Sequence, residues 1–243
     1  MRQWMPEARH LEDEEIYLDV KWAEHATPRL ALNMVVGLDG GVTLDGRSGP
    51  VGGEADRAAF AALRDAADVI LVGAGTARAE NYGPPVRGVR AAARRIERGQ
   101  LAVPTLAIVT ASVDLLPTHR VFADPGHLPL IVTSAAAPEA RVASLRSLGV
   151  EVLVSGEQEV DLVGAIKDLG TRGLHLLCEG GPRLNTALFD AGLVDEVFVT
   201  LAPLLTGSEK HLVTSALRDR VDLTLMGVIE AGSELLLRYQ VAR

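Results

Sequence analysis

Two glycine-rich junctions, each joining an apolar strand to a helix, are the segments of this sequence best suited to bind a ligand. Residues 69–76 read Val-Ile-Leu-Val-Gly-Ala-Gly-Thr, and residues 176–184 read Leu-Leu-Cys-Glu-Gly-Gly-Pro-Arg-Leu. Glycine carries no side chain, so an anion can approach the backbone closely, and the unpaired N–H groups of the helix start attract it. Pro182 suits the first helical position, where a missing N–H costs nothing.

Arg183 places a positive charge at the second junction, which is then typical of a pyrophosphate site at the carboxyl edge of an α/β sheet. Neither junction has the Gly-x-Gly-x-x-Gly pattern of a Rossmann unit or the Gly-Lys-Ser/Thr of a Walker loop. Each alone is therefore equally consistent with a tight turn that binds nothing. Two such junctions, on strands that could be neighbours, favour a dinucleotide.

Patterns of other catalytic and metal-binding classes are absent from the sequence. It has no Gly-x-Ser-x-Gly elbow, which argues against an α/β-hydrolase, and its six histidines have no metal-ligand spacing. The one cysteine, Cys178, excludes an internal disulfide and a multi-cysteine zinc site. Cys178 and His175 both fall in an expected strand, so we predict a buried, inert thiol and a packed imidazole.

Five arginines between residues 87 and 98 form the most basic segment of the chain. They lie mostly on a short helix expected over 88–98. Either they form a solvated basic face, or they clamp a phosphate. They are Arg87, Arg90, Arg94, Arg95 and Arg98.

Length and charge restrict the class of protein. The 243 residues are 48% apolar and carry 24 Lys and Arg against 32 Asp and Glu, a net charge of −8, which argues against nucleic-acid binding. Charged residues interrupt the first eleven positions, where a secretory signal needs an apolar core. No apolar run reaches the roughly 18 residues of a membrane span. We therefore expect a cytoplasmic protein that binds neither nucleic acid nor membrane.

Alternating strand and helix patterns must position the glycine junctions. Short apolar runs predict strands over 30–36, 69–72, 105–110, 129–133, 150–154, 174–178 and 196–201. Helical spacing predicts helices over 56–67, 138–148, 160–169 and 182–191. This alternation indicates an α/β fold with a mainly parallel central sheet, covered by helices on both faces.

The end of the chain breaks this alternation. Strands expected over 221–229 and 233–241 are separated by only three residues, too few for a parallel crossover. We expect a C-terminal antiparallel hairpin on the sheet edge. Its apolar run at 235–237 would need cover there, so we also expect a homodimer.

Residues 1–28 differ from the regular remainder, 29–243, which we expect to be one domain. They hold an acidic cluster at 12–15 and both tryptophans, Trp4 and Trp22. The simplest expectation is a flexible N-terminal arm. The alternative is an arm packed on the body or on a partner subunit, with the tryptophan rings as anchors.

At this point five segments carry a resemblance to a known family. In chain order they are residues 30–40 (LALNMVVGLDG), the junction at 69–76, and residues 179–185 (EGGPRLN), 192–196 (GLVDE) and 202–207 (APLLTG). Together they resemble the reductase domain of the bifunctional riboflavin-biosynthesis protein RibD, over about residues 29–241. The resemblance implies a dihydrofolate-reductase-like three-layer fold and NADPH-dependent reduction of 5-amino-6-(5-phosphoribosylamino)uracil to the ribityl compound.

In the bifunctional protein a zinc deaminase domain precedes the reductase, and that chemistry needs a His/Cys/Cys site. This chain has one cysteine and 28 residues in that place, so we expect a stand-alone reductase without a metal.

Site residues follow from the resemblance. It implies Glu80 as a catalytic residue that orients the ribose or relays a proton. It implies cofactor contacts at Val51, Gly52, Gly73, Gly75, Thr76, Glu80, Thr110, Ser112, Gly180, Gly181, Pro182, Arg183, Leu184 and Asn185. It implies substrate contacts at Asn33, Ser48, Arg64, Asn81, Arg87 and Glu179. For Arg64, which falls on an expected helix, a surface ion pair is the alternative.

The sequence departs from the family pattern mainly on the substrate side. Asn33 stands where the family usually has Lys, Glu80-Asn81-Tyr82 where it has Asp-Asp-Pro, and Pro84 where it has Leu. On the cofactor side, Ser112 matches a serine near the adenosine 2′-phosphate, but Leu115 replaces a frequent arginine just beyond it. Reduction of a pterin or related pyrimidine, and a catalytically silent NADP-binding homologue, are the alternative functions.

Overall fold

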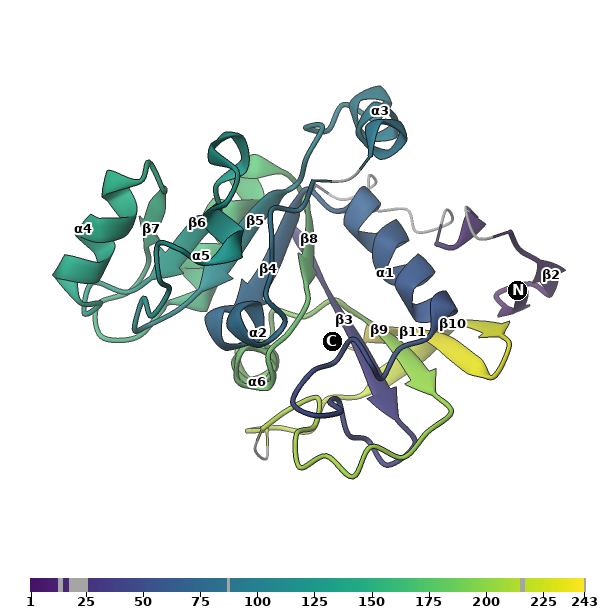
Figure 1. Cartoon of the computed structure of the whole chain (residues 1–243). Coiled ribbons are helices and arrows are strands. Elements are labelled where there is room, and N and C mark those ends of the chain that lie inside the picture. Colours follow the sequence, from purple (N-terminus) through teal and green to yellow (C-terminus); the bar gives the residue numbers. More distant parts are fainter. Residues whose placement is uncertain (13–14, 18–25, 87, 215–216, 243) are drawn as a thin grey trace.

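The computed structural model of the protein describes residues 1–12, 15–17, 26–86, 88–214 and 217–242. In these residues the strands form one mixed sheet, and Figure 1 shows it crossing the molecule from β7 at one end to β2 at the other. The strand order is β2-β1-β10-β11-β9-β3-β8-β4-β5-β6-β7. The described residues include no helix long and apolar enough to cross a membrane.

Parallel strands make up the larger part of this sheet and carry both glycine junctions. Their branched and apolar side chains suit strands that are covered on both faces. Each begins and ends within two residues of the predicted bounds. In sheet order they are β9 (Glu196–Ala202), β3 (Arg29–Gly37), β8 (His175–Cys178), β4 (Val69–Gly73), β5 (Thr105–Val109), β6 (Leu130–Thr133) and β7 (Val152–Val154).

Helices cover both faces of the sheet, so the predicted three-layer α/β architecture is confirmed. On one face Leu63 and Leu145 pack in a core cluster with Ile70, and on the other Ile166 and Leu188 pack with Leu71. The first face carries α1 (Glu54–Ala66), α2 (Ala74–Ala79) and α4 (Glu139–Ser147); the second carries α5 (Leu162–Leu169) and α6 (Pro182–Asp190). A further helix, α3 (Val89–Glu97), contacts α1.

The predicted C-terminal hairpin is present, but it does not lie on the edge of the sheet. It consists of β10 (Leu223–Ala231) and β11 (Glu234–Val241), and β11 pairs with β9 in the interior. The N-terminal strand β1 (Arg2–Met5) pairs antiparallel with the second half of β10, and β2 (Arg9–His10) follows outside it. The edge prediction is wrong because the chain's own N-terminus supplies two more strands.

The described part of the N-terminal segment packs on the body, so the expectation of a flexible arm is wrong for these residues. Leu11 and Ile16 are 3% and 1% exposed, in a cluster with Ala59 of α1 and Leu236 of β11. Trp4 is half-exposed, and its indole Nε1 donates to a Glu230 carboxylate oxygen at 2.8 Å. The other tryptophan lies outside the described residues.

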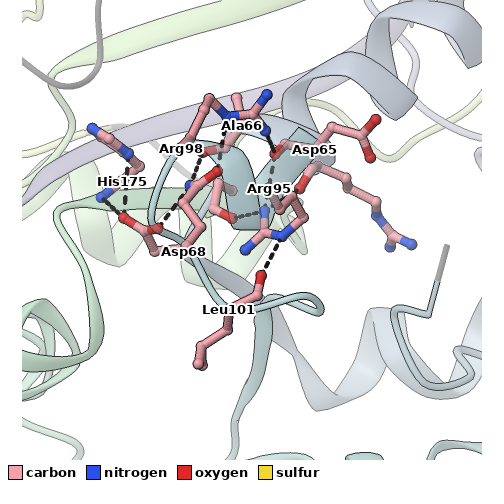
Figure 2. Close-up of polar contacts among 10 residues, drawn as sticks. Asp65, Ala66, Asp68, Arg95, Arg98, Leu101 and His175 are labelled. Atoms are coloured by element: carbon pink, nitrogen blue, oxygen red, sulfur yellow. Dashed lines mark hydrogen bonds and ion pairs between the residues drawn. The ribbon is translucent and has the colours of Figure 1, made fainter. Parts of the chain in front are cut away.

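Arg95 closes the C-terminal end of α1, as Figure 2 shows. Its side chain is 1% exposed; Nη1 donates to the carbonyls of Asp65 and Ala67 at 2.9 and 2.5 Å, and Nε to that of Leu101 at 2.8 Å. Arg98 Nη2 donates to the Asp65 carbonyl at 2.6 Å. Both cations also oppose the negative end of the helix dipole. Both roles predicted for the arginine segment, a solvated basic face and a phosphate clamp, are wrong for Arg95, because its buried guanidinium caps the end of α1.

His175 and Asp68 join the start of β8 to the start of β4. The imidazole Nδ1 lies 3.2 Å from Asp68 Oδ2, which also accepts from the His175 amide, while Gln100 donates to Oδ1 (Figure 2). Burial would raise the pKa of Asp68, but these hydrogen bonds outweigh it and hold that pKa below its ordinary value. The packed imidazole predicted at His175 is confirmed.

We expect Arg95→Met to lower the free energy of unfolding by about 3 kcal/mol or more, because buried helix carbonyls would lose their donors. Urea unfolding followed by circular dichroism measures this. Arg90→Met, at an exposed position of the same helix, is the control and should change stability by less than about 0.5 kcal/mol. Equal stability of the two variants would contradict the capping role.

Candidate functional site

The two glycine junctions meet at the carboxyl edge of the sheet, because β4 and β8 are parallel neighbours, as the sequence allowed. The Gly73 amide donates to the Gly180 carbonyl at 2.9 Å. The Gly181 amide, at the N-cap of α6, donates to Thr76 Oγ1 at 3.1 Å. Four residues assigned to the cofactor by resemblance thus come from two distant segments and contact each other directly.

The second junction suits a diphosphate. Gly180 has a φ of +86°, and a Cβ added there would lie 2.9 Å from Met34 Sδ, so any other residue would be strained at this position. The amides of Arg183 and Leu184, in the first turn of α6, have no acceptor within the helix. These donors and the exposed Arg183 guanidinium match the chemistry of a pyrophosphate. The residues present therefore fit the diphosphate of a dinucleotide.

Several residues assigned to the cofactor have buried side chains. The Asn185 amide group donates to the Leu212 carbonyl at 2.8 Å, which joins α6 to the loop after β9. Thr110 Oγ1 accepts from the Val113 amide at 3.0 Å. These residues therefore present little or no surface to a ligand. The four are Val51, Thr110, Leu184 and Asn185, which are 2%, 7%, 8% and 0% exposed.

A buried ion pair joins two of the residues that the resemblance implies as substrate contacts. Arg64 of α1 and Glu179, directly after β8, form two hydrogen bonds, Nε to Oε1 and Nη2 to Oε2, each 2.6 Å long. The Tyr82 hydroxyl donates to the same Oε2 at 2.6 Å. The Arg64 guanidinium also stacks over the Phe60 ring, 4.3 Å from its centre. Arg64 and Glu179, two of the predicted substrate contacts, therefore lie together, but their charged groups bind each other.

Burial and the Glu179 carboxylate together set the pKa values of Arg64 and Tyr82. The Glu179 side chain is 1% exposed and that of Arg64 18%. Burial alone would lower the pKa of Arg64, but the Glu179 carboxylate outweighs it and raises that pKa. Burial and the same carboxylate raise the pKa of Tyr82 well above its ordinary value of 10.0. The surface ion pair considered for Arg64 is therefore an internal one, with a neutral phenol as third member.

Asn33 lies beside this group. Leu32 and Cys178 are the last paired residues of β3 and β8, so Asn33 and Glu179 follow at equivalent positions of neighbouring strands. Asn33 is 8% exposed. The Cys178 thiol is 0% exposed, and burial raises its pKa to about 12, so the predicted inert thiol is confirmed.

Glu80 lies at the C-terminal end of α2, between the junctions and the loop before α1. Its Oε1 accepts from the Ser48 amide at 2.6 Å, so the predicted catalytic carboxylate contacts a predicted substrate residue. Asn81 follows in the left-handed region, with a φ of +50°. This turn directs residue 82 back toward the ion pair. Arg87, the last predicted substrate residue, lies outside the described residues.

Two residues of the site had no predicted role. Tyr82 was noted only as a departure from the family pattern, although a hydroxyl two residues after Glu80 was the available signal. Glu234, from β11, accepts from the Gly53 and Ala55 amides at 2.7 and 3.2 Å and so caps the start of α1. No sequence signal pointed to this cap, because 179 residues separate Glu234 from Ala55.

Residues 28–237 match the RibD C-terminal domain family. A curated relative from Methanothermobacter thermautotrophicus, named 2,5-diamino-6-ribosylamino-4(3H)-pyrimidinone 5′-phosphate reductase, is 31% identical over 88% of this chain and 98% of its own length. The riboflavin biosynthesis protein RibD of Chlamydia trachomatis is 30% identical over 76% of this chain, which matches 48% of that longer protein.

Solved structures agree with this likeness. A pyrimidine reductase-like protein from Corynebacterium diphtheriae superposes with a TM-score of 0.83 at 28% identity, covering 96% of this chain and all of the other. The riboflavin biosynthesis reductase of Saccharomyces cerevisiae has a TM-score of 0.63 at 17% identity, covering 89% and 90%. The fold class expected from the resemblance is confirmed.

We predict that Tyr82 stays protonated in the folded protein above pH 10. Unfolded tyrosine loses its proton near pH 10, so the unfolded state then binds fewer protons than the folded one, and stability falls as the pH rises further. Urea unfolding of the wild type and Tyr82→Phe at pH 8 and pH 10.5 measures this. The advantage of the wild type at pH 8 should shrink at pH 10.5; a constant difference would contradict the raised pKa.

Proposed function

Because the chain belongs to the RibD C-terminal domain family, we propose that it is an NADPH-dependent reductase of a phosphorylated ribosylaminopyrimidine in riboflavin biosynthesis. The observation that carries the proposal is the contact between the two glycine junctions, through Gly181 and Thr76, beside the Glu80 carboxylate. Such an arrangement can hold a dinucleotide at one edge of the sheet and a substrate next to it.

The proposed substrate is the 2,5-diamino pyrimidinone 5′-phosphate after which the stand-alone relatives are named. Three of them are 28–31% identical to this chain. The uracil compound implied by the sequence resemblance differs only in the group at pyrimidine C2, oxygen instead of nitrogen. Both compounds carry the same ribose phosphate, so one site can present either sugar to the cofactor.

The cofactor would be held by the chain at three places. Backbone amides at the start of α6 and the Arg183 guanidinium would bind the diphosphate. Gly73, Gly75 and Thr76 would border the diphosphate at its nicotinamide end, because Thr76 contacts Gly181 at the start of α6 and a Cβ on Gly75 meets nothing within 4 Å. When bound, NADPH supplies the hydride. For this transfer the protein must above all position the acceptor carbon close to the hydride donor of NADPH; electrostatic stabilisation comes second.

Glu80 is the residue we propose to act on the sugar. The reducible form of the substrate is its ring-opened imine, and reduction adds a hydride to C1′ and a proton to the attached nitrogen. The Ser48 amide holds Oε1 of Glu80, which leaves Oε2 to orient a ribose hydroxyl or pass on the proton. Glu179 does not serve as this acid or base in the proposal, because Arg64 and Tyr82 occupy both of its oxygens.

A homodimer in the cytoplasm completes the proposal. The first half of β10 has no partner strand on its outer side among the described residues, and Leu223, Leu225 and Met226 there are 44%, 36% and 40% exposed. An apolar strand edge of this kind favours association with a second copy. Light scattering should give twice the chain mass of 25.8 kDa; the mass of one chain would contradict it.

The function is tested by following NADPH oxidation at 340 nm with three substrates in parallel: the diamino pyrimidinone phosphate, its uracil counterpart and dihydrofolate. We expect the highest kcat/KM with the diamino compound and a ribityl product by mass spectrometry. Faster turnover of dihydrofolate would favour the pterin alternative. Binding of NADPH without turnover of any of the three would favour a silent homologue.

Glu80→Gln is the matched variant in that assay, because glutamine keeps an oxygen that can accept from the Ser48 amide but cannot relay a proton. We expect kcat to fall about a hundredfold and the Kd for NADPH to stay within about threefold. Unchanged kcat would contradict the proton role and leave Glu80 as a positioning group.

A further inference from the structure

A dinucleotide bound with its diphosphate at the start of α6 can extend its adenosine half in only one direction along the sheet edge. With the diphosphate at the start of α6, the carboxyl edge continues on one side to β3 and on the other to β5 and β6. The first side holds Asn33 and the Glu179 ion pair, which the family resemblance implies as substrate contacts. The adenosine half would therefore lie over the loops that follow β5 and β6.

The loop after β5 turns its apolar residues inward and its polar ones outward. Val113 and Leu115 are 1% and 6% exposed and belong to the core cluster under α2 and α4. Ser112 and Asp114 alternate with them and are exposed. Val113 has a φ of +49°, an unusual conformation for a branched residue, which the hydrogen bond to Thr110 holds in place. Position 115 thus cannot present any group to a ligand.

Two guanidinium groups from other elements reach the exposed side of this loop. Arg141, in the first turn of α4, donates from Nη1 to the Ser112 carbonyl at 2.9 Å. Arg78, near the end of α2, donates from Nη1 to the Asp114 carbonyl at 2.6 Å. Their side chains remain 50% and 43% exposed, so both keep donors available to solvent or to a ligand.

One carboxylate opposes these cations. Asp114 Oδ1 lies 4.0 Å from Arg141 Nη1, and Oδ2 lies 3.7 Å from Arg78 Nη1. The Asp114 side chain is 55% exposed, and both contacts are longer than a hydrogen bond. Nearby, burial and then the charge of Arg78 lower the pKa of His119, which favours its neutral form. The group of Arg78, Arg141 and Asp114 therefore has a net charge of +1 on an acidic protein.

We infer that Arg141 binds the 2′-phosphate of NADPH and so makes the enzyme prefer it to NADH, in place of the cation that Leu115 cannot supply. The inference rests on the proposed function, and the residue that it names belongs to α4 and not to the loop after β5. A guanidinium suits this role because it binds phosphate oxygens through two parallel N–H groups. Asp114 acts against the phosphate, since a carboxylate at this place favours the free 2′-hydroxyl of NADH.

The test measures Kd by the fluorescence of bound NADPH and NADH, and by calorimetry with 2′,5′-ADP and 5′-AMP as probes that lack nicotinamide. Arg141→Gln should weaken NADPH and 2′,5′-ADP about tenfold or more, the usual effect of losing a charged hydrogen bond, and change NADH and 5′-AMP less than about twofold. Asp114→Asn, which leaves Arg141 in place, should instead tighten NADPH binding. Arg146→Gln, exposed on the same helix, is the control.

The possible outcomes test the role of Arg141 separately from the proposed reductase activity. Equal loss of both dinucleotides in Arg141→Gln, or no loss, overturns the inference, as does a wild type that binds NADPH and NADH equally. Weaker NADH binding in Asp114→Asn with unchanged NADPH binding also overturns it. None of these results touches the reductase proposal, which the pyrimidine assay tests separately. A wild type that binds neither dinucleotide overturns both.

Discussion

The buried carboxylate of Glu179 is the constraint on which the arrangement of the site depends. A charge with 1% exposure must be paired, and here it is bound by a guanidinium and a phenol at 2.6 Å each. Arg64 comes from α1 and Tyr82 from the turn after α2, so one carboxylate fixes the distance between both segments and the end of β8. The same turn carries Glu80, whose position relative to the sheet therefore follows from the pairing of Glu179.

Sequence periodicity was enough to predict the parallel strands and the helices that cover them. Runs such as Val69 to Val72 leave no other interpretation once they alternate with helical spacing. The glycines and Pro182 marked where the two strands end and helices begin, but that these strands are neighbours was left open and comes from the structure. Periodicity carries no information about partners far apart in the chain. It therefore missed the pairing of β1 with β10, the Glu234 cap and the buried role of Arg95.

Site residues were predicted less completely than the elements that carry them. The resemblance named Arg64, Glu179, Ser48 and Glu80, and the structure brings them together in two pairs. It could not show that the first pair is internal, since that depends on the burial of Glu179 and on Tyr82. It also could not show that Leu115 faces the core. The segment around Leu115 is an irregular loop, and no helix or strand periodicity in the sequence tells which of its residues point inward.

The first strand of the chain, β1, pairs with the next-to-last strand, β10, and this has a consequence for how the protein folds. Arg2 pairs with Glu230, and β11 supplies both the partner of β9 and the carboxylate that caps α1. These contacts join residues from opposite ends of the sequence, so the entropy of closing a very large loop must be overcome before they form. During synthesis, β1, β9 and the start of α1 must therefore wait for the C-terminal hairpin to leave the ribosome. Until then the chain presents open strand edges on one side of an otherwise complete parallel sheet.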